Sequence, residues 1–452
     1  MTVAAPAPLP KASPADTLRI LLLAAGPLFA KGLIRRRPAM VRFLARTDAE
    51  ARGIALLARL RAKYGEGPLR LAFPLRGAAL ILSPRHLRRL LAETPEPFAA
   101  DTPEKRASLA HFQPRGVLVS SGAERAERRR FNEAVLETGC PVHSLAPALI
   151  RLCEGEAASL LARGGFAWPE FQAAWFRMVR AAIFGPAARD DEALTAMLHA
   201  LRGDANWAFL KPRRRRLRRT FLAAVGEKLR QAPADSLAGL ARARATPEAA
   251  PEDQIAHWLF AFDAAAIGAF RTLAMLALHP DAAARARRDR PFVRAAMLDT
   301  LRLWPTTPAV LRRSERDTDW EGRTLPAGTG LLVHLPFFHR DRGRIPYADR
   351  FTPAAWLDGR AEAWPFVPFS AGPAGCPAAN LVLLVAGAWI EAAIRRHVVL
   401  LPPGTGLDPE ALPATFDHFA LRLSLRPLPR SRREPALLGA VNPLSPDGDF
   451  DG

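Results

Sequence analysis

The chain has 452 residues, of which 49% are hydrophobic and 24% charged, and these proportions exclude wholesale disorder. Three cysteines, Cys140, Cys153 and Cys376, are too few for a disulfide framework and lack zinc-site spacing, which indicates a reducing, cytoplasmic environment. The formal net charge of +20 indicates either an ordinary solvated surface or a basic face that attracts an acidic protein or an anionic membrane. No nucleic-acid recognition motif accompanies this charge, so we expect no nucleic-acid partner.

The first apolar stretch covers residues 18–34 and is interrupted by Gly26, Pro27 and Lys31. It falls short of the roughly 20 apolar residues of a membrane-spanning helix. It also lacks the cleavage site of a signal peptide. We expect residues 1–45 to form an arm that either packs on the main domain or rests on a membrane surface.

Residues 69–82 read as two short strands joined at Arg76-Gly77, and Ser83-Pro84 then opens a helix. Helical periodicity dominates the rest of the chain. It predicts helices near 122–138, 144–164, 168–184, 191–208, 217–231, 254–278, 291–304 and 378–397.

Two segments between these helices are not expected to be helical. Residues 232–252 are expected to be a polar, proline-bearing connection, and residues 309–335 short strands around a turn at 326–328. The pattern predicts a mainly α fold with small β-sheets. We assign residues 46–425 to one catalytic domain and 426–452 to a C-terminal tail.

The segment most informative about chemistry is 364–390, where a loop rich in glycine and proline leads through Cys376 into a long apolar helix. Backbone N–H groups and the helix dipole at that end would stabilise a thiolate. The small neighbours of Cys376 would let a large flat cofactor approach, and such a thiolate could ligate haem iron. A buried, inert cysteine is the alternative that the residues alone leave open.

The run Phe369-x-x-Gly372-x-x-Gly375-Cys376 resembles the haem-binding loop of the cytochrome P450 superfamily. Further pieces similar to that family follow its order and spacing, and the resemblance covers about residues 65–425. These pieces are 117–131 (VLVSSGAERAERRRF), 258–280 (WLFAFDAAAIGAFRTLAMLALHP), 299–308 (DTLRLWPTTP), 322–341 (GRTLPAGTGLLVHLPFFHRD) and 349–357 (DRFTPAAWL).

The resemblance implies the cytochrome P450 fold, a haem b cofactor and Cys376 as the ligand of its iron. It nominates further cofactor contacts at Phe369, Gly372 and Ala261. For the haem propionates it nominates three arginines, a residue type suited to carboxylates: Arg125, Arg129 and Arg312.

Several positions depart from the family's pattern. The E-x-x-R acid is Asp299, which can still pair with Arg302 one helical turn later as a structural ion pair. The arginine that would complete their network is absent at Ala355. Ala374 stands where the haem-binding loop usually has arginine, and Ala378 where it has glycine.

The central helix keeps an acid, Asp263, but has Ala264 and Ala265 where the family has threonines. In the family the second threonine holds a water and relays protons during dioxygen activation. Because Ala265 has no hydroxyl, proton delivery would rely on Asp263, ordered water or a substrate hydroxyl. His339 is expected to be a structural histidine beside Asp341.

By resemblance, the protein is expected to be a monooxygenase that inserts one oxygen atom from O2 into an apolar substrate. Electrons would come from NAD(P)H through a ferredoxin or flavodoxin and its reductase, since the chain has no flavin or nicotinamide fingerprint. The expected substrate pocket is lined by Phe260, Ala261, Ala264, residues 307–310 and the loop 100–118. The alternatives are an H2O2-using peroxygenase, favoured by Ala265, and a degenerate haem-binding protein without activity.

Overall fold

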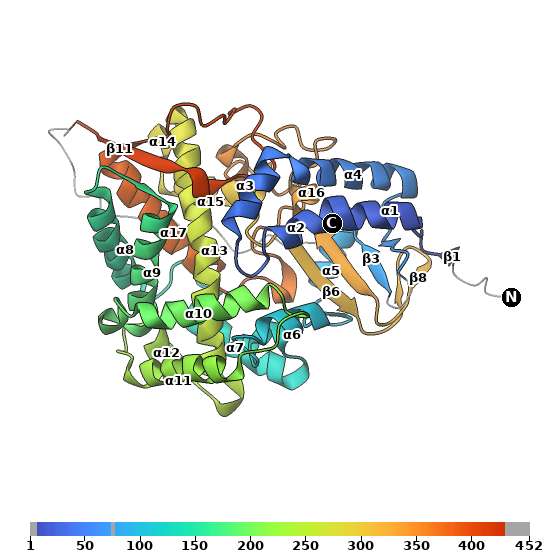
Figure 1. Ribbon diagram of the computed structural model, residues 1–452, viewed down its shortest axis with the longest axis horizontal. Helices are drawn as coiled ribbons and strands as arrows, with labels where there is room; N and C mark the ends of the chain where they lie inside the picture. The colour runs from blue at the N-terminus through green and yellow to red at the C-terminus, as the bar shows by residue number, and fades with distance from the viewer. Residues whose placement is uncertain (1–6, 74–76, 430–452) are drawn as a thin grey trace.

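The computed structural model describes residues 7–73 and 77–429. Figure 1 shows a helix-rich half and a half that contains most of the β-structure, with the long helix α13 (Pro251–Leu278) crossing the molecule between them. Parts of the expected arm and tail, residues 1–6 and 430–452, and Arg76 of the expected turn lie outside the described residues.

The largest described sheet has five strands in the order β2-β3-β9-β6-β4. Its strands are β2 (Leu69–Arg70), β3 (Ala78–Leu80), β4 (Phe98–Ala99), β6 (Ala309–Ser314) and β9 (Gly330–His334). β6 and β9 run antiparallel with Leu311 opposite Leu332, and β3 joins β9 in parallel. Alternating burial along β6 leaves one face of this strand in the core and buries Arg312.

The N-terminal segment is folded onto this sheet. β1 (Ala7–Pro8) pairs in parallel with β8 (Arg323–Leu325), which pairs with β7 (Thr318–Asp319). A π-helical segment, Ile20–Ala25, links α1 (Pro14–Arg19) to α2 (Gly26–Ala30), and Ile20 and Ala24 join the same apolar core as the sheet. The first residues described are therefore part of the packed structure.

Most helices surround α13 or cover the large sheet (Figure 1). The helices before α13 are α3 (Pro38–Arg46), α4 (Ala49–Tyr64), α5 (Pro84–Ala92), α6 (Pro103–Leu109), α7 (Gly122–Leu136), α8 (Ala146–Leu161), α9 (Trp168–Phe184), α10 (Glu192–Ala205), α11 (Arg215–Gln231) and α12 (Leu237–Arg244). Those after it are α14 (Pro280–Ala286), α15 (Arg290–Leu303), α16 (Leu335–His339) and α17 (Ala379–Arg396). A second small sheet has the order β10-β11-β5, from β5 (Gly165–Ala167), β10 (His397–Leu400) and β11 (Arg422–Pro427).

Helix α13 is the centre of the main core. It packs against α9, α15 and α17, and most of its side chains are buried. Residues 247–278 are long and apolar enough to cross a membrane, but 83% of the relevant window is buried inside the protein, as in a core helix of a water-soluble domain. Its length and apolar character are thus explained by packing within the protein.

The helices expected from periodicity are present, with ends within a few residues of the expected ones. The expectation of a polar connection over 232–252 is wrong, because this segment contains α12. The side chain of Ser236 caps that helix by accepting from the Gly239 N–H at 3.1 Å, and Leu237 and Ala241 are fully buried. The three prolines of this segment, at positions 233, 247 and 251, lie outside the helix rather than interrupt it.

Candidate active site

Cys376 lies in a hairpin-like loop three residues before α17. Its N–H donates to the Phe369 carbonyl at 2.8 Å, and the Gly375 N–H donates to the Gly372 carbonyl at 2.8 Å, so the loop folds back on itself. The stretch from Ala374 to Asn380 is partly exposed, although the helix that follows is mostly buried. Cys376 therefore keeps some accessible surface just before a helix that is otherwise mostly buried.

Gly372 is required by the conformation of this loop. Its φ is +65°, which side chains rarely adopt, and an added Cβ would lie 2.2 Å from the carbonyl oxygen of Leu91 at the end of α5. Glycine at this position thus lets the loop pack closely on α5. Phe369 packs against the main core from the other end of the loop.

Burial raises the pKa of the Cys376 thiol, although the Ala378 backbone N–H and the nearby Arg129 lower it. The expected N–H donor at the helix start is present, but it does not outweigh desolvation. The free cysteine is therefore a thiol at neutral pH, and ligation to a metal would release its proton.

Two arginines of α7 lie near the loop. Arg129 donates to the Gly375 carbonyl at 2.6 Å and to Glu133 at 2.5 Å, so it braces the backbone beside Cys376. Arg125 is buried and donates to the Val117 carbonyl at 3.1 Å. Of the other arginines of this helix, Arg130 is exposed and pairs with Glu127.

Lys105 of α6, Arg125 and Arg312 of β6 form a cluster of cations, which we call the cationic cradle. Burial, the largest cause, and Arg125 together lower the pKa of Arg312 to about 10. The pKa of Lys105 lies well below its ordinary value because of burial and both arginines. Asp101 and Glu104 oppose this repulsion, but Asp101 is already paired with Arg106.

The cationic cradle fits the haem implied by the resemblance. Cations that are buried together at a cost need a counter-charge, and the two propionates of haem would supply it. Lys105 was not expected to contribute; nothing in its sequence context separates it from an ordinary surface lysine. It offers a cation that can compensate for the arginine missing at Ala374.

The pair Asp299 and Arg302 is fully buried in α15. Arg302 donates to both carboxylate oxygens, at 2.6 and 3.2 Å, and to the carbonyls of Ala348 and Arg350. Asp299 also accepts from the Thr352 N–H at 2.6 Å and from the Trp356 indole at 3.1 Å. The Trp356 indole and the Thr352 amide thus donate hydrogen bonds to Asp299, whereas the buried Ala355 has no side-chain donor.

His339 makes two backbone hydrogen bonds. Its Nε2 accepts from the Val367 N–H at 3.1 Å, and its Nδ1 lies 3.3 Å from the Arg302 carbonyl, to which it donates. The expected place beside Asp341 is wrong, because Asp341 instead pairs with Arg61 at 2.5 Å. His339 ties the segment before the cysteine loop to the end of α15, a structural role.

One face of α13 is partly exposed within an otherwise buried helix. Its residues follow helical spacing: His257, Phe260, Ala261 and Ala264. Phe112 of the expected pocket loop approaches Phe260, with ring centroids 5.5 Å apart. This face of small and aromatic side chains is an accessible part of α13, and α13 itself packs on α17, which follows the cysteine loop.

Asp263 is buried and held from two sides. Arg202 of α10 donates to one oxygen at 2.6 Å, and Gln172 of α9 donates to the other at 2.9 Å. Burial by itself would raise the pKa of Asp263, but Arg202 and these hydrogen bonds hold it below its ordinary value. The carboxylate is therefore ionised, and Ala265 beside it is buried without a hydroxyl.

Comparison with known proteins agrees with this geometry. Residues 275–413 match the family model described as Cytochrome P450. A cyclooctat-9-en-7-ol 5-monooxygenase from Streptomyces melanosporofaciens is 35% identical over 120 residues, 26% of each chain. A probable cytochrome P450 4d20 from Drosophila melanogaster is 30% identical over 33% of this chain and 31% of its own length.

These matches span about a third or less of each curated relative. Solved structures match over most of the chain. A retinoic acid-bound cyanobacterial CYP120A1 superposes with a TM-score of 0.66 at 18% identity, covering 82% of this chain and 94% of that one. CYP175A1 from Thermus thermophilus gives a TM-score of 0.64 at 22% identity, covering 82% and 94%.

Proposed function

Because the chain belongs to the cytochrome P450 superfamily, we propose that it is a haem-thiolate monooxygenase that inserts one oxygen atom from O2 into an apolar organic substrate. The observation that carries the proposal is the placement of Cys376 just before α17, near Arg129, which in turn lies near Arg125 of the cationic cradle. Haem b, when bound, would supply the redox chemistry of oxygen activation.

The protein's own residues would position that cofactor. Cys376 would be the proximal ligand, with Arg129 holding the backbone of its loop through the Gly375 carbonyl. The cationic cradle would bind the propionates. The partly exposed face of α13, including Ala261, would cover the distal side.

Proton delivery is proposed to involve Asp263. Its carboxylate is engaged by Arg202 and Gln172, so it would move a proton only when this arrangement opens or through water beside it. Ala265 leaves no hydroxyl for this role. These two facts favour a second candidate, direct use of H2O2, in which the relay is not needed.

The substrate is proposed to be bulky and apolar. The distal region presents Phe260 and small side chains of α13, and the buried Phe112 packs against the Phe260 ring. Among the relatives, one is named for its reaction with cyclooctat-9-en-7-ol and another is described with retinoic acid bound. A lipid-like, terpenoid or aromatic substrate fits this lining.

The two candidate reactions are separated by the source of the inserted oxygen. Compounds that shift the Soret band of the haem-loaded protein would be incubated under two conditions. One contains isotopically labelled O2, NAD(P)H, a surrogate ferredoxin and its reductase; the other contains isotopically labelled H2O2. Product that carries oxygen from labelled O2 supports the monooxygenase. Product formed only with peroxide favours the peroxygenase, and no product under either condition contradicts both.

The electron donor is proposed to be an acidic ferredoxin or flavodoxin. The chain carries +20 charges, and the partly or fully exposed Arg88, Arg130 and Arg294 lie on the elements around the cysteine loop. Arg88 donates to the Ala363 carbonyl and Arg294 to Asn380. Positive charge near the proximal side would steer an acidic partner to this face.

We also propose that the protein, otherwise cytoplasmic, contacts a membrane surface. Two neighbouring segments carry most of the exposed large apolar side chains in the described residues: Leu18, Leu21, Leu22, Phe29, Phe43, Trp207, Phe209 and Leu210. The segments meet where the Arg37 guanidinium lies 4.4 Å from the centre of the Trp207 ring. Phe209 and Leu210 are 72% and 78% exposed and precede the basic run Lys211–Arg219, a combination suited to anionic lipid.

A further inference from the structure

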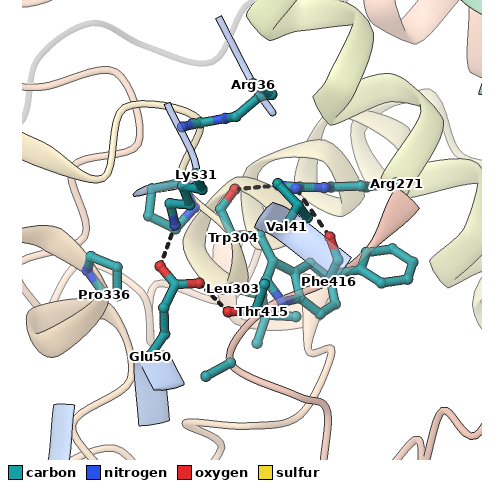
Figure 2. Close-up of a pocket in the computed structure, with 12 residues that line it drawn as sticks. Lys31, Arg36, Val41, Glu50, Arg271, Leu303, Trp304, Pro336, Thr415 and Phe416 are labelled. Carbon is teal, nitrogen blue, oxygen red and sulfur yellow. Dashed lines mark hydrogen bonds and ion pairs between the residues drawn. The ribbon is translucent and has the colours of Figure 1, made fainter. Parts of the chain in front are cut away.

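A small cavity lies away from the cysteine loop, between the N-terminal segment, α13, the end of α15 and residues 414–416 (Figure 2). Its volume is about 20 Å³, enough for one water-sized particle. Three cations and one carboxylate line it, with apolar side chains such as Val41 and Trp304 between them. The charged residues are Lys31, Arg36, Arg271 and Glu50.

The carboxylates near this cavity in the described part of the chain each have a cation of their own. Glu50 pairs with Lys31 and accepts from the Thr415 hydroxyl, as Figure 2 shows. Asp263 pairs with Arg202 at 2.6 Å, and Asp417 lies 3.6 Å from Arg42.

Arg36 and Arg271 therefore have no carboxylate partner among the described residues. Arg36 donates to the carbonyls of Gly32 and Thr306, at 2.6 and 2.5 Å. Arg271 donates at 3.3 Å to the carbonyls of Trp304 and Phe416, and its Nη2 lies 3.3 Å from the His418 ring. The Nε of Arg271, a side chain only 8% exposed, has no hydrogen-bond partner.

The electrostatic cost of this arrangement is visible in the pKa of Arg271. Burial, the largest cause, and the nearby Arg36 together lower it to about 9, against the opposing effects of Glu50 and Asp417. Two buried or partly buried guanidinium groups without a counter-ion are unfavourable, and a bound anion would relieve both. This surplus of cations is separate from the cationic cradle, which the haem propionates would neutralise.

We propose that this cavity binds one small monovalent anion, either a free ion or the carboxylate end of a longer molecule, through Arg36 and Arg271 beside Lys31. The anion would join four segments that are far apart in the sequence. It would thereby fasten the N-terminal segment around Lys31 to α13 and to the turn after α15. The site does not depend on the proposed oxidation chemistry.

The test measures thermal unfolding of the full-length, haem-loaded protein in sodium salts of equal ionic strength. Chloride and formate, but not the larger, non-carboxylate methanesulfonate, are expected to raise the midpoint by about 2 °C or more, because they bind the folded state. Octanoate is compared with octanol to test the carboxylate end of a longer molecule. Stabilisation by octanoate alone would assign the site to such a molecule, and equal midpoints in all salts would overturn the proposal.

Two variants locate the effect. Arg36→Gln removes one guanidinium from the cavity and should abolish the anion-specific rise, whereas Arg35→Gln, the same change at the exposed neighbour, should keep it. If both variants retain the rise, the anion binds elsewhere and the proposal fails. Should Arg36→Gln not fold, the line width of the chlorine NMR signal of the unmodified protein, with formate as competitor, decides whether chloride is bound.

Discussion

Asp299 shows how one residue's surroundings offset a shorter side chain. Its two oxygens receive hydrogen bonds from the Arg302 guanidinium, the Thr352 amide and the Trp356 indole, and neither member of the ion pair is exposed. Such a pair contributes mainly by leaving no buried charge unpaired. It is an intact buried network, which argues against the view that the chain is a degenerate remnant.

We predict that Asp299→Ala destabilises the protein by about 3–5 kcal/mol, because Arg302 would remain buried without its partner. Asp299→Glu, although it restores the family's usual acid, is expected to cost about 1–3 kcal/mol, since the added methylene has no space. Denaturant unfolding of the haem-loaded variants measures both. A glutamate variant more stable than the original protein would contradict the packing argument.

Lys105 is predicted to act on the cofactor rather than on the fold. In Lys105→Met the repulsion with Arg312 and Arg125 disappears, so the apoprotein should unfold at the same or a higher temperature. Haem affinity should nevertheless fall about tenfold, the effect of roughly 1.4 kcal/mol, because a propionate loses a cation. Haem titration and apoprotein melting give the two values.

The control for that prediction is Arg130→Met, which removes an exposed arginine paired with Glu127 on α7. It should leave haem affinity unchanged. If Lys105→Met and Arg130→Met bind haem equally well, the side chain of Lys105 does not contact the cofactor.

At the scale of the element, the cysteine loop depends on its fit against α5. Gly372 has a positive φ and faces the Leu91 carbonyl. Gly372→Ala should therefore displace the loop and reduce haem retention, with a loss of stability of about 1–3 kcal/mol. The same substitution at Gly387 of α17, where an added Cβ would lie 4.0 Å from the Val293 side chain, is the control and should retain haem.

The segment that precedes the loop is tied down by His339, whose pKa burial lowers to about 3, with Arg302 adding to the shift. In the unfolded chain the pKa of a histidine is about 6.5, so below that pH the unfolded state binds a proton that the folded state does not bind. The stabilisation is complete above pH 6.5 and is lost as the pH falls, by about 1.4 kcal/mol per pH unit for each such histidine.

We therefore expect the unfolding free energy to fall between pH 6.5 and about pH 4, more gently in His339→Gln than in the original protein. The same change at the partly exposed His397 should leave the slope as it was. Urea unfolding across this pH range measures the slope. A His339→Gln slope equal to that of the original protein would show that this histidine does not couple to folding.

Periodicity and caps predicted most helices because those signals are local: the long apolar run of α13 and the helix after Ser83-Pro84 need only neighbours in the sequence. Ser83 occupies the expected capping position, but its side chain makes no capping hydrogen bond. Helix α12 was missed because the prolines of residues 232–252 indicated a loop and its short, alanine-rich sequence shows no clear apolar face. The contacts of Lys105, Arg202 and Trp356 depend on partners distant in the sequence, which no local pattern specifies.

At the scale of the whole molecule, the distribution of exposed apolar side chains predicts its behaviour at membranes. The protein should co-sediment with vesicles of anionic phosphatidylglycerol and much less with neutral phosphatidylcholine, and salt should weaken the binding. Phe209→Ser combined with Leu210→Ser should reduce it several-fold, because these are the most exposed apolar side chains of the patch.

The control for that measurement is Phe73→Ser, an exposed phenylalanine outside the two segments, which should bind vesicles like the original protein. If the variant with Phe209→Ser and Leu210→Ser binds vesicles as well as the original protein, or if both lipids are bound equally, these segments are not a membrane-docking surface.

The proposed oxidation chemistry depends most directly on Cys376 as the ligand of a haem. The decisive measurement is the absorption spectrum of the purified protein, reduced with dithionite under carbon monoxide. We predict a strongly red-shifted Soret band, abolished in Cys376→Ala and retained in Cys140→Ala, the same change at an exposed cysteine. A band without the shift, its persistence in Cys376→Ala, or the absence of haem after reconstitution would contradict the account.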